Sequence, residues 1–158
     1  MKLKIALFIN IMLFALVMGV FWGTWISLDP AHLTYGAATF LDVGNTMIAN
    51  LAPTMPFFVI ISLLSSLPVL YGQYRQKNKG FYFSLIGFLL MLTATITTLA
   101  VNVPIDNEIK TWTISTIPAN WKEIWSHWAA YHTFRTFFSI SALGFAVTGG
   151  LFPRAATV

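Results

Sequence analysis

The residues of this chain that could do chemistry are concentrated in one segment, residues 102–135. It holds three of the five acidic residues, two of the three histidines and four of the six tryptophans. The rest of the chain is mostly apolar, in runs of the length of helices. Since polar groups are scarce elsewhere, we expect this segment to form the functional part of the protein.

The last part of the segment has the spacing of one helix face. From residue 121 onward, selected residues recur at alternating steps of four and three, which places them on one stripe of an α-helix. The stripe consists of Trp121, Trp125, Trp128, His132, Arg135, Ser139, Ala142 and Ala146. We expect it to face the interior, with aromatic and ionisable groups toward one end and small residues deeper down. His127 lies on a different face, and we leave it out of the candidate site.

Arg135 suggests the chemistry, because it should lie just inside the hydrocarbon layer of a membrane. An ionisable group there is costly and normally faces the protein interior or a water cavity, with a partner. Asp106 is the best candidate for the counter-charge. Weaker candidates are Asp29, Asp42 and Glu123. Two interpretations stay open: a buried pair that only joins two helices, or a cavity in which arginine and asparagine bind an anionic or enolic oxygen while His132 or Asp106 takes a proton.

The composition predicts a membrane protein and excludes several other classes. The chain is 57% hydrophobic and 9% charged, against about 25% charged for soluble domains. Its net charge of +4 comes from cations at helix ends, without a basic stripe, so no nucleic-acid partner is expected. The absence of cysteine excludes disulfides, thiolate metal sites and a cysteine nucleophile. The expected partners are the lipid bilayer and a hydrophobic small molecule.

The apolar runs predict an all-α, integral membrane four-helix bundle formed by one domain, residues 1–158. A bilayer core about 30 Å thick needs about 20 apolar residues per helix. Such helices are expected at residues 5–28, 53–71, 80–101 and 121–151. The first is expected to be retained, because it is long for a signal peptide and no small-residue cleavage site closes it. Residues 31–52 form a mixed connection that could hold a short interfacial helix.

Prolines and polar residues set the expected helix limits. Pro53 and Pro56 suit the first turn of the second helix, whereas Pro68 should kink or end it. Pro104 should end the third helix. Asn120 looks like an N-cap for the fourth, with a glutamate three residues later as in a capping box.

Basic residues predict the orientation. They gather at the N-terminus, between the second and third helices, and at the C-terminus: Lys2, Lys4, Arg75, Lys77, Lys79 and Arg154. The positive-inside rule then makes both termini cytoplasmic. The polar and aromatic connection between helices three and four falls on the outer side, as do all six tryptophans. These form either an aromatic collar at the interface or the wall of a pocket.

Several helix faces predict contacts. A stripe of small residues on the first helix could let a second copy or a membrane-complex partner approach closely: Ala15, Gly19, Gly23 and Ser27. Asn10 is expected to form an interhelical hydrogen bond. Met91, Thr95, Thr98 and Asn102 share one face of the third helix, whose threonines are expected to bond back to helix carbonyls or to pack between helices.

No cofactor is predicted and no metal ligands are assigned, but haem or metal binding stays an alternative. Two axial histidines should come from facing helices, whereas His127 and His132 share one helix on different faces. His32 lies in a connection. A metal site formed by His32, His132 and a carboxylate therefore remains open.

One set of residues resembles a known family. The set is Asn102-Val103-Pro104-Ile105-Asp106-Asn107, then Trp112, Trp121 and the run Trp128-x-x-Tyr131-His132-x-x-Arg135-Thr136. It is similar to the anthrone-oxygenase-like family of small four-helix membrane proteins, many of which carry only a domain-of-unknown-function label. The resemblance covers most of the chain. Asp106 stands where that family usually has asparagine, and His132 where asparagine or histidine occurs, so both add a titratable group.

The resemblance implies a monooxygenase without a cofactor, acting on an anthrone- or quinol-like aromatic. A base removes a proton from an activated carbon, and the resulting anion reacts with dioxygen. The catalytic residues would be His132, Asp106 and Arg135, with either of the first two as base. The substrate-binding residues would be Asn102, Asn107, Trp112, Trp121, Trp125 and Trp128. A non-enzymatic membrane subunit or lipid- or partner-binding protein is the alternative, and a haem- or metal-binding protein is a further one.

Overall fold

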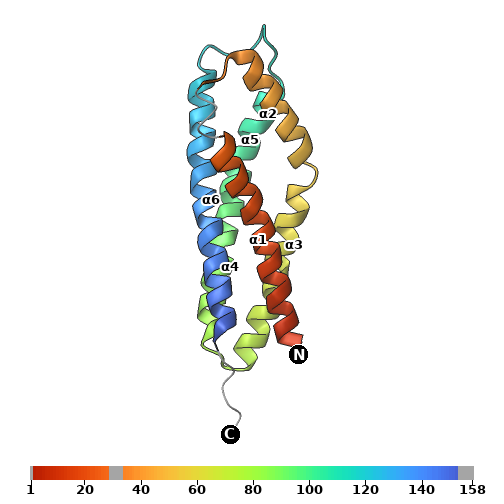
Figure 1. The fold of residues 1–158 in the computed structure, drawn as a ribbon, viewed down its shortest axis with the longest axis vertical. Helices are drawn as coiled ribbons and strands as arrows, with labels where there is room; N and C mark the ends of the chain where they lie inside the picture. The colour runs from red at the N-terminus through yellow and green to blue at the C-terminus, as the bar shows by residue number, and fades with distance from the viewer. Residues whose placement is uncertain (1, 29–33, 153–158) are drawn as a thin grey trace.

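The computed structural model describes residues 2–28 and 34–152, and the regular secondary structure of these residues is all helical. In order, its elements are α1 (Lys2–Leu28), α2 (Ala37–Leu51), α3 (Met55–Arg75), α4 (Gly80–Thr97), the π-helical turn η2 (Thr98–Asn102), α5 (Val103–Ile109) and α6 (Trp121–Leu151). Figure 1 shows an elongated molecule with its longest helices along the long axis. The prediction of an all-α protein is confirmed. Asp29, His32 and Arg154 lie outside the described residues.

Four helical segments are long and apolar enough to cross a membrane. They are Lys2–Leu28, Met55–Arg75, Gly80–Ile109 and Trp121–Leu151. Many large apolar side chains on them are exposed, including Phe8 at 65% and Leu64 at 56%. Such surfaces suit contact with lipid rather than water. The findings therefore support a multi-pass membrane protein.

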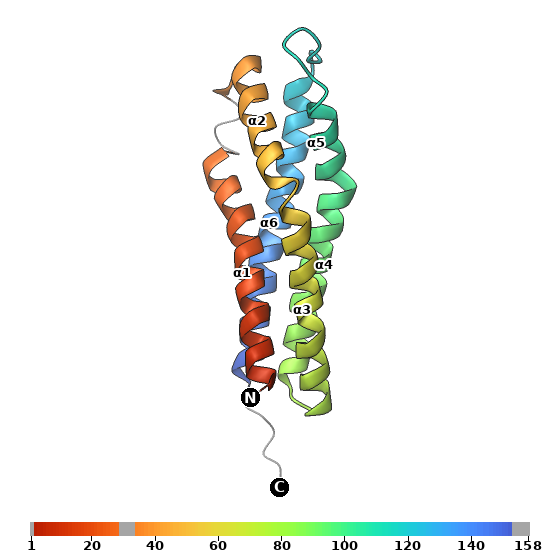
Figure 2. The ribbon, with the colours of Figure 1, turned by 90° about the vertical axis from the view of Figure 1, so that its right-hand side faces the viewer.

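The two ends of the molecule differ in what they carry. Figures 1 and 2 place the N-terminus, the connection between α3 and α4 and the end of α6 at one end. The opposite end carries α2, α5 and the connection between α5 and α6. The basic connection and the aromatic connection are thus at opposite ends. Which end faces the cytoplasm stays a prediction.

The expected end of the third spanning helix at Pro104 is wrong. The helix passes from α4 through η2 and α5 to Ile109 without leaving helical geometry. Pro104 lies in the first turn of α5, where its missing N–H is tolerated. Just before Pro104, the π-helical turn shifts the main-chain hydrogen bonds from four-residue to five-residue spacing. The helix therefore carries Asp106 and Asn107, which the sequence analysis placed in a loop.

Two further details of the expected helix limits need correction. Helix α3 was expected at residues 53–71, with Pro68 kinking or ending it, but it runs from Met55 to Arg75 with Pro68 inside it. Pro56 lies in its first turn as expected, whereas Pro53 precedes the helix. Helix α6 has the predicted limits, but the side chain of Asn120 makes no capping hydrogen bond. Its backbone, at φ −94° and ψ 20°, is not in the extended region that an N-cap needs.

Helices α4 and α6 pack closely because small residues face each other. A Cβ atom on Gly87 of α4 would lie 2.9 Å from the carbonyl oxygen of Ala142 and 3.1 Å from the amide nitrogen of Ala146. A Cβ atom on Gly149 would be equally crowded by Ser84. The small half of the predicted α6 stripe thus forms a helix–helix contact, as expected.

Helix α1 packs through a different face from its small-residue stripe. Its buried residues are Asn10, Phe14, Val17 and Phe21. Gly19, Gly23 and Ser27 are exposed, and a Cβ atom on either glycine would meet nothing within 4 Å. The amide nitrogen of Asn10 donates to the hydroxyls of two serines of α3, both at 2.9 Å. The expected interhelical bond of Asn10 is confirmed, and the stripe remains a predicted contact for another molecule.

Candidate functional site

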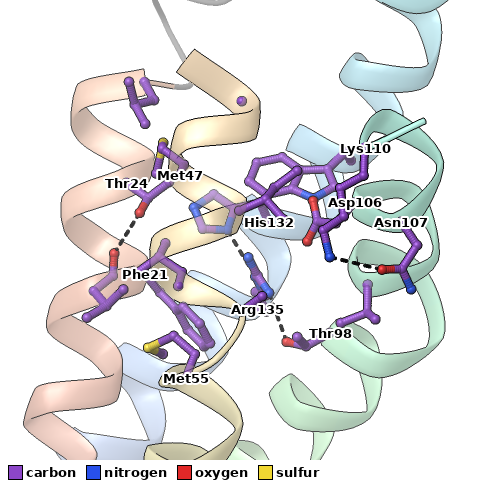
Figure 3. A pocket seen from close by; sticks show the side chains of 18 of the residues that line it. Phe21, Thr24, Met47, Met55, Thr98, Asp106, Asn107, Lys110, His132 and Arg135 are labelled. Atoms are coloured by element: carbon purple, nitrogen blue, oxygen red, sulfur yellow. Dashed lines mark hydrogen bonds between the residues drawn. The ribbon is translucent and has the colours of Figure 1, made fainter. Parts of the chain in front are cut away.

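A cavity of about 320 Å³ lies between all four membrane-spanning segments. It is bordered by the end of α1, by α2 and the start of α3, by the junction of α4 and α5, and by the middle of α6. Most of its surface is apolar, and its polar groups gather on the α5 and α6 side. Figure 3 shows Asp106, Asn107, Lys110, His132 and Arg135 around this space. This is the distribution expected of a ligand pocket, mostly apolar with a few convergent polar groups.

Two interruptions of the helices border the cavity. One is the break between α2 and α3, which contributes Leu51, Ala52 and Met55. The other is the π-helical turn, which contributes Thr98 and Leu99. Interrupted helices in membrane proteins and π turns in general frequently lie at functional sites. Their sequence cause is visible, since prolines at positions 53, 56 and 104 lie next to both interruptions.

Three stacked rings of α6 form one wall of the cavity. Trp125 and Trp128 stack with centroids 4.5 Å apart and planes 11° from parallel. Trp128 stacks in turn on His132, at 4.7 Å and 22°. From α2, Phe40 meets Trp125 edge-on at 5.0 Å. The spacing of three and four residues places the rings one above the other, which gives a flat, rigid surface.

Arg135 is held at the lower end of this wall by two hydrogen bonds and two aromatic rings. Its Nε donates to Nδ1 of His132 at 2.9 Å, and its Nη1 donates to the hydroxyl of Thr98 at 3.1 Å. The guanidinium lies 4.5 Å from the ring centroid of Phe21 and 5.6 Å from that of Trp128. Only 8% of the residue is exposed. These contacts fix the position of a permanent positive charge inside the bundle.

Asp106 projects from α5 into the same cavity. Its carboxylate interacts electrostatically with Arg135 and Lys110. The indole N–H of Trp128 is directed at it, although that nitrogen does not reach the geometry of a standard hydrogen bond with any described residue. Lys110, one turn further along the chain, donates to the side-chain oxygen of Asn107 at 3.2 Å. Among the described residues, the cavity lining thus contains one carboxylate, which lies near two cations.

The predicted site residues fall into two groups. Those that line the cavity are Asp106, Asn107, Trp125, Trp128, His132 and Arg135. Those outside its lining are Asn102, Trp112 and Trp121. Asn102 is fully buried and donates to the main-chain oxygen of Trp128 at 3.1 Å, so it joins η2 to α6. The two tryptophans pack around Phe40, with centroids 6.4 and 4.6 Å from it.

Several lining residues were not identified from the sequence. Phe21 and Thr24 come from α1, and Met47 comes from α2. The apolar sequence of α1 does not reveal which of its faces is buried. Lys110 could have been identified, because it lies four residues after Asp106 and thus on the same helix face.

Three of the residues that were discounted or ranked low from the sequence, His127, Asp42 and Glu123, lie away from the cavity. His127 is exposed and packs against Tyr131, with centroids 4.9 Å apart. Asp42 and Glu123 are exposed and do not line the cavity. Thr93 and Thr95 of α4 bond back to helix carbonyls, as expected, at 2.9 and 2.8 Å, and Thr95 also lines the cavity. Within the described residues there is no group of three metal-ligating side chains.

The fold and the site together define a membrane protein with an internal polar and aromatic cavity. The family model for anthrone oxygenase matches residues 45–145, a stretch that runs from α2 into α6. The chain belongs to this family, which confirms the resemblance stated above. No curated protein and no solved structure matches the chain.

Proposed function

We propose that this protein is a membrane-embedded oxygenase that oxidises a flat, hydrophobic aromatic molecule of the anthrone or quinol type, without a cofactor. The observation that carries the proposal is the cavity itself. It combines a stacked tryptophan wall with the carboxylate of Asp106 and the fixed guanidinium of Arg135. Family membership agrees with this reaction class.

The size and surface of the cavity suit a small fused-ring molecule. Ligand pockets commonly have volumes of roughly 300–1,000 Å³, and this cavity, at about 320 Å³, lies at the lower end of that range. A planar molecule can pack against the edges of the α6 rings that border the cavity, since aromatic pairs also meet edge to face at centroid separations of about 4.5–7 Å. Its oxygen substituents would then meet the polar groups of α5 and α6.

For an anthrone, the proposed reaction replaces a methylene group by a carbonyl group. A base removes one proton from the methylene, and the electron pair spreads onto the conjugated carbonyl oxygen. The carbanion carbon bonds to one atom of dioxygen, and protonation of the outer atom gives a hydroperoxide. Loss of the second methylene hydrogen and cleavage of the O–O bond then give the quinone carbonyl and one water molecule. Dioxygen is the oxidant, so atoms and electrons balance.

Arg135 is the group that stabilises the developing negative charge. Charge-stabilising donors are most effective when they are fixed before the reaction and shielded from water. Arg135 meets both conditions, since it is hydrogen-bonded on two sides and almost fully buried. The proton acceptor must be a basic group of the same cavity.

The test uses purified protein in lipid nanodiscs, anthrone and dioxygen labelled with heavy oxygen. We expect quinone formation above the rate in empty nanodiscs, with one heavy oxygen atom in each quinone. Arg135→Lys keeps the charge but loses the forked geometry, and we expect its rate to fall by about 10- to 1,000-fold, as for other oxyanion donors. His127→Asn, on the same helix but outside the cavity, is the control.

Two outcomes separate the alternatives. Quinone formation no faster than in empty nanodiscs, with tight binding of the aromatic molecule, would replace the oxygenase by a binding protein. An Arg135→Lys variant that melts much earlier but retains full activity would show that this arginine only joins helices.

A further inference from the structure

The hydrogen bond between Arg135 and His132 determines which ring nitrogen carries the proton. The Nε of arginine bears a hydrogen, and the guanidinium stays protonated in proteins. At 2.9 Å from this donor, Nδ1 of His132 must be an acceptor and must lack a hydrogen. His132 is therefore a neutral imidazole with its single proton on Nε2.

The surroundings of Nε2 agree with this tautomer. Figure 3 shows that the ring nitrogen away from Arg135 points toward α1. The main-chain oxygen of Phe21 lies on that side, within electrostatic range of the ring. Its geometry is outside that of a standard hydrogen bond to a described residue. A carbonyl oxygen nonetheless favours an N–H over a bare nitrogen at this position.

Neither nitrogen of His132 is then free to take a proton from a substrate. Nε2 already carries one. Protonation of Nδ1 would break its bond to Arg135 and place two cations in contact, which is strongly unfavourable at low dielectric. The plane of the ring is fixed, because it stacks on Trp128 at 4.7 Å and meets Phe21 edge-on at 6.2 Å. A half-turn within that plane would exchange Nδ1 for a carbon atom and lose the hydrogen bond to Arg135.

Asp106 remains as the basic group. Among the residues that the structure describes, it is the one carboxylate that lines the cavity. A carboxylate accepts a proton without needing an existing one to leave. It lies within electrostatic range of Arg135, the Trp128 N–H and the Lys110 ammonium, on the side of the cavity that carries the ring wall.

We propose that Asp106 is the catalytic base of this cavity and that His132 is a positioning residue that acts through Arg135. This inference rests on the proposed function, since it assigns the proton acceptor of that reaction. His132 accepts from Nε, and Thr98 accepts from Nη1. Together they fix the plane of the guanidinium between α6 and η2.

The test isolates proton removal from the reaction with dioxygen. Anthrone is incubated without oxygen in heavy water with the protein in nanodiscs, and deuterium entry into its methylene is followed by mass spectrometry. We expect Asp106→Asn to slow the exchange by about 100- to 10,000-fold, the usual contribution of a general base. Asp42→Asn on the exposed face of α2 is the matched carboxylate control, with no change expected.

Two variants of His132 separate positioning from catalysis. The side-chain oxygen of His132→Asn replaces Nδ1 as the acceptor for Arg135, so exchange should fall by less than about tenfold. His132→Leu offers no acceptor and should lose about 10- to 100-fold, as expected for one hydrogen bond to a charged group. Rescue by asparagine is the result that a proton-accepting histidine cannot give.

Specific results would contradict the assignment of Asp106 as the base. The inference is overturned if His132→Asn loses as much as Asp106→Asn while both variants melt like the parent, or if Asp106→Asn exchanges at the parent rate. Nitrogen NMR of the imidazole tests the protonation of His132 without turnover. A proton on Nδ1 at neutral pH would overturn the assignment of the single proton to Nε2. Deuterium exchange without quinone formation in oxygen would overturn the proposed oxygenase and leave the assignment of the base intact.

Discussion

The close contact between α4 and α6 predicts that a methyl group added at Gly87 of α4 destabilises the protein. In Gly87→Ala, the new methyl group would lie 2.9 and 3.1 Å from main-chain atoms of α6 and 3.4 Å from the Cβ of Phe145. Main-chain atoms cannot move aside as side chains can, so the helices must separate. Overpacking of this kind typically costs about 1–3 kcal/mol.

A matched control removes the effect of helix propensity. Gly144 lies inside α6, and a Cβ atom there meets nothing within 4 Å. Alanine is favoured over glycine by about 0.8–1.0 kcal/mol in a helix interior, and this gain is common to both variants. The free energy of unfolding should therefore differ between Gly87→Ala and Gly144→Ala by the packing cost alone, about 1–3 kcal/mol.

The assay is reversible unfolding in mixed micelles with increasing denaturing detergent, followed by circular dichroism. The parent and both alanine variants are compared at equal protein concentration. Because α4 continues into η2, separation of the helices should also lengthen the bond of 3.1 Å between Arg135 and Thr98 and reduce quinone formation. Equal unfolding free energies for the two variants would refute the close α4–α6 contact.

Two further variants test individual contacts. Asn10→Ala removes the hydrogen bonds to two serines of α3. It should lower the free energy of unfolding by about 0.6–2 kcal/mol, which is the range for polar contacts between membrane helices. An unchanged unfolding midpoint would contradict the contact. Trp128→Phe keeps the stacked ring but removes the N–H directed at Asp106, so steady-state kinetics should show a lower kcat. Its KM should change less than that of Trp128→Leu, which also loses the stacking surface. A parent-like kcat would mean that this N–H does not act on the carboxylate.

The α6 half of the site was predictable because its signal is local. Aromatic, ionisable and small residues at steps of three and four define a buried stripe on any helix of that length. The described structure buries each of these residues, from Trp121 to Ala146. Burial of Arg135 with a polar partner also followed from the cost of an isolated charge in a membrane.

The opposite half of the site depends on information that the local sequence lacks. Pro104 fits both the end of a helix and the first turn after an interruption, and only the packing of η2 against α6 decides between them. Helix α1 has one polar residue in its central part, Asn10, which indicates its buried face, but nothing in its sequence shows that Phe21 on that face lies against Arg135. The position of α2 over the cavity depends on contacts between distant parts of the chain, such as Gly44 with Ile109.

The location of the cavity among membrane-spanning helices changes what selects its ligand. A molecule dissolved in lipid has already lost its contact with water, so moving it into the cavity brings no hydrophobic gain. For the same reason, the hydrophobic effect does not drive helices together within a bilayer. Selection must come from ring stacking and from the pairing of polar substituents with Arg135 and Asp106. A saturated hydrocarbon of the right shape, which offers neither, should therefore stay in the lipid. The apparent affinity for any ligand should fall as the amount of lipid in the assay rises, because the lipid dilutes the ligand.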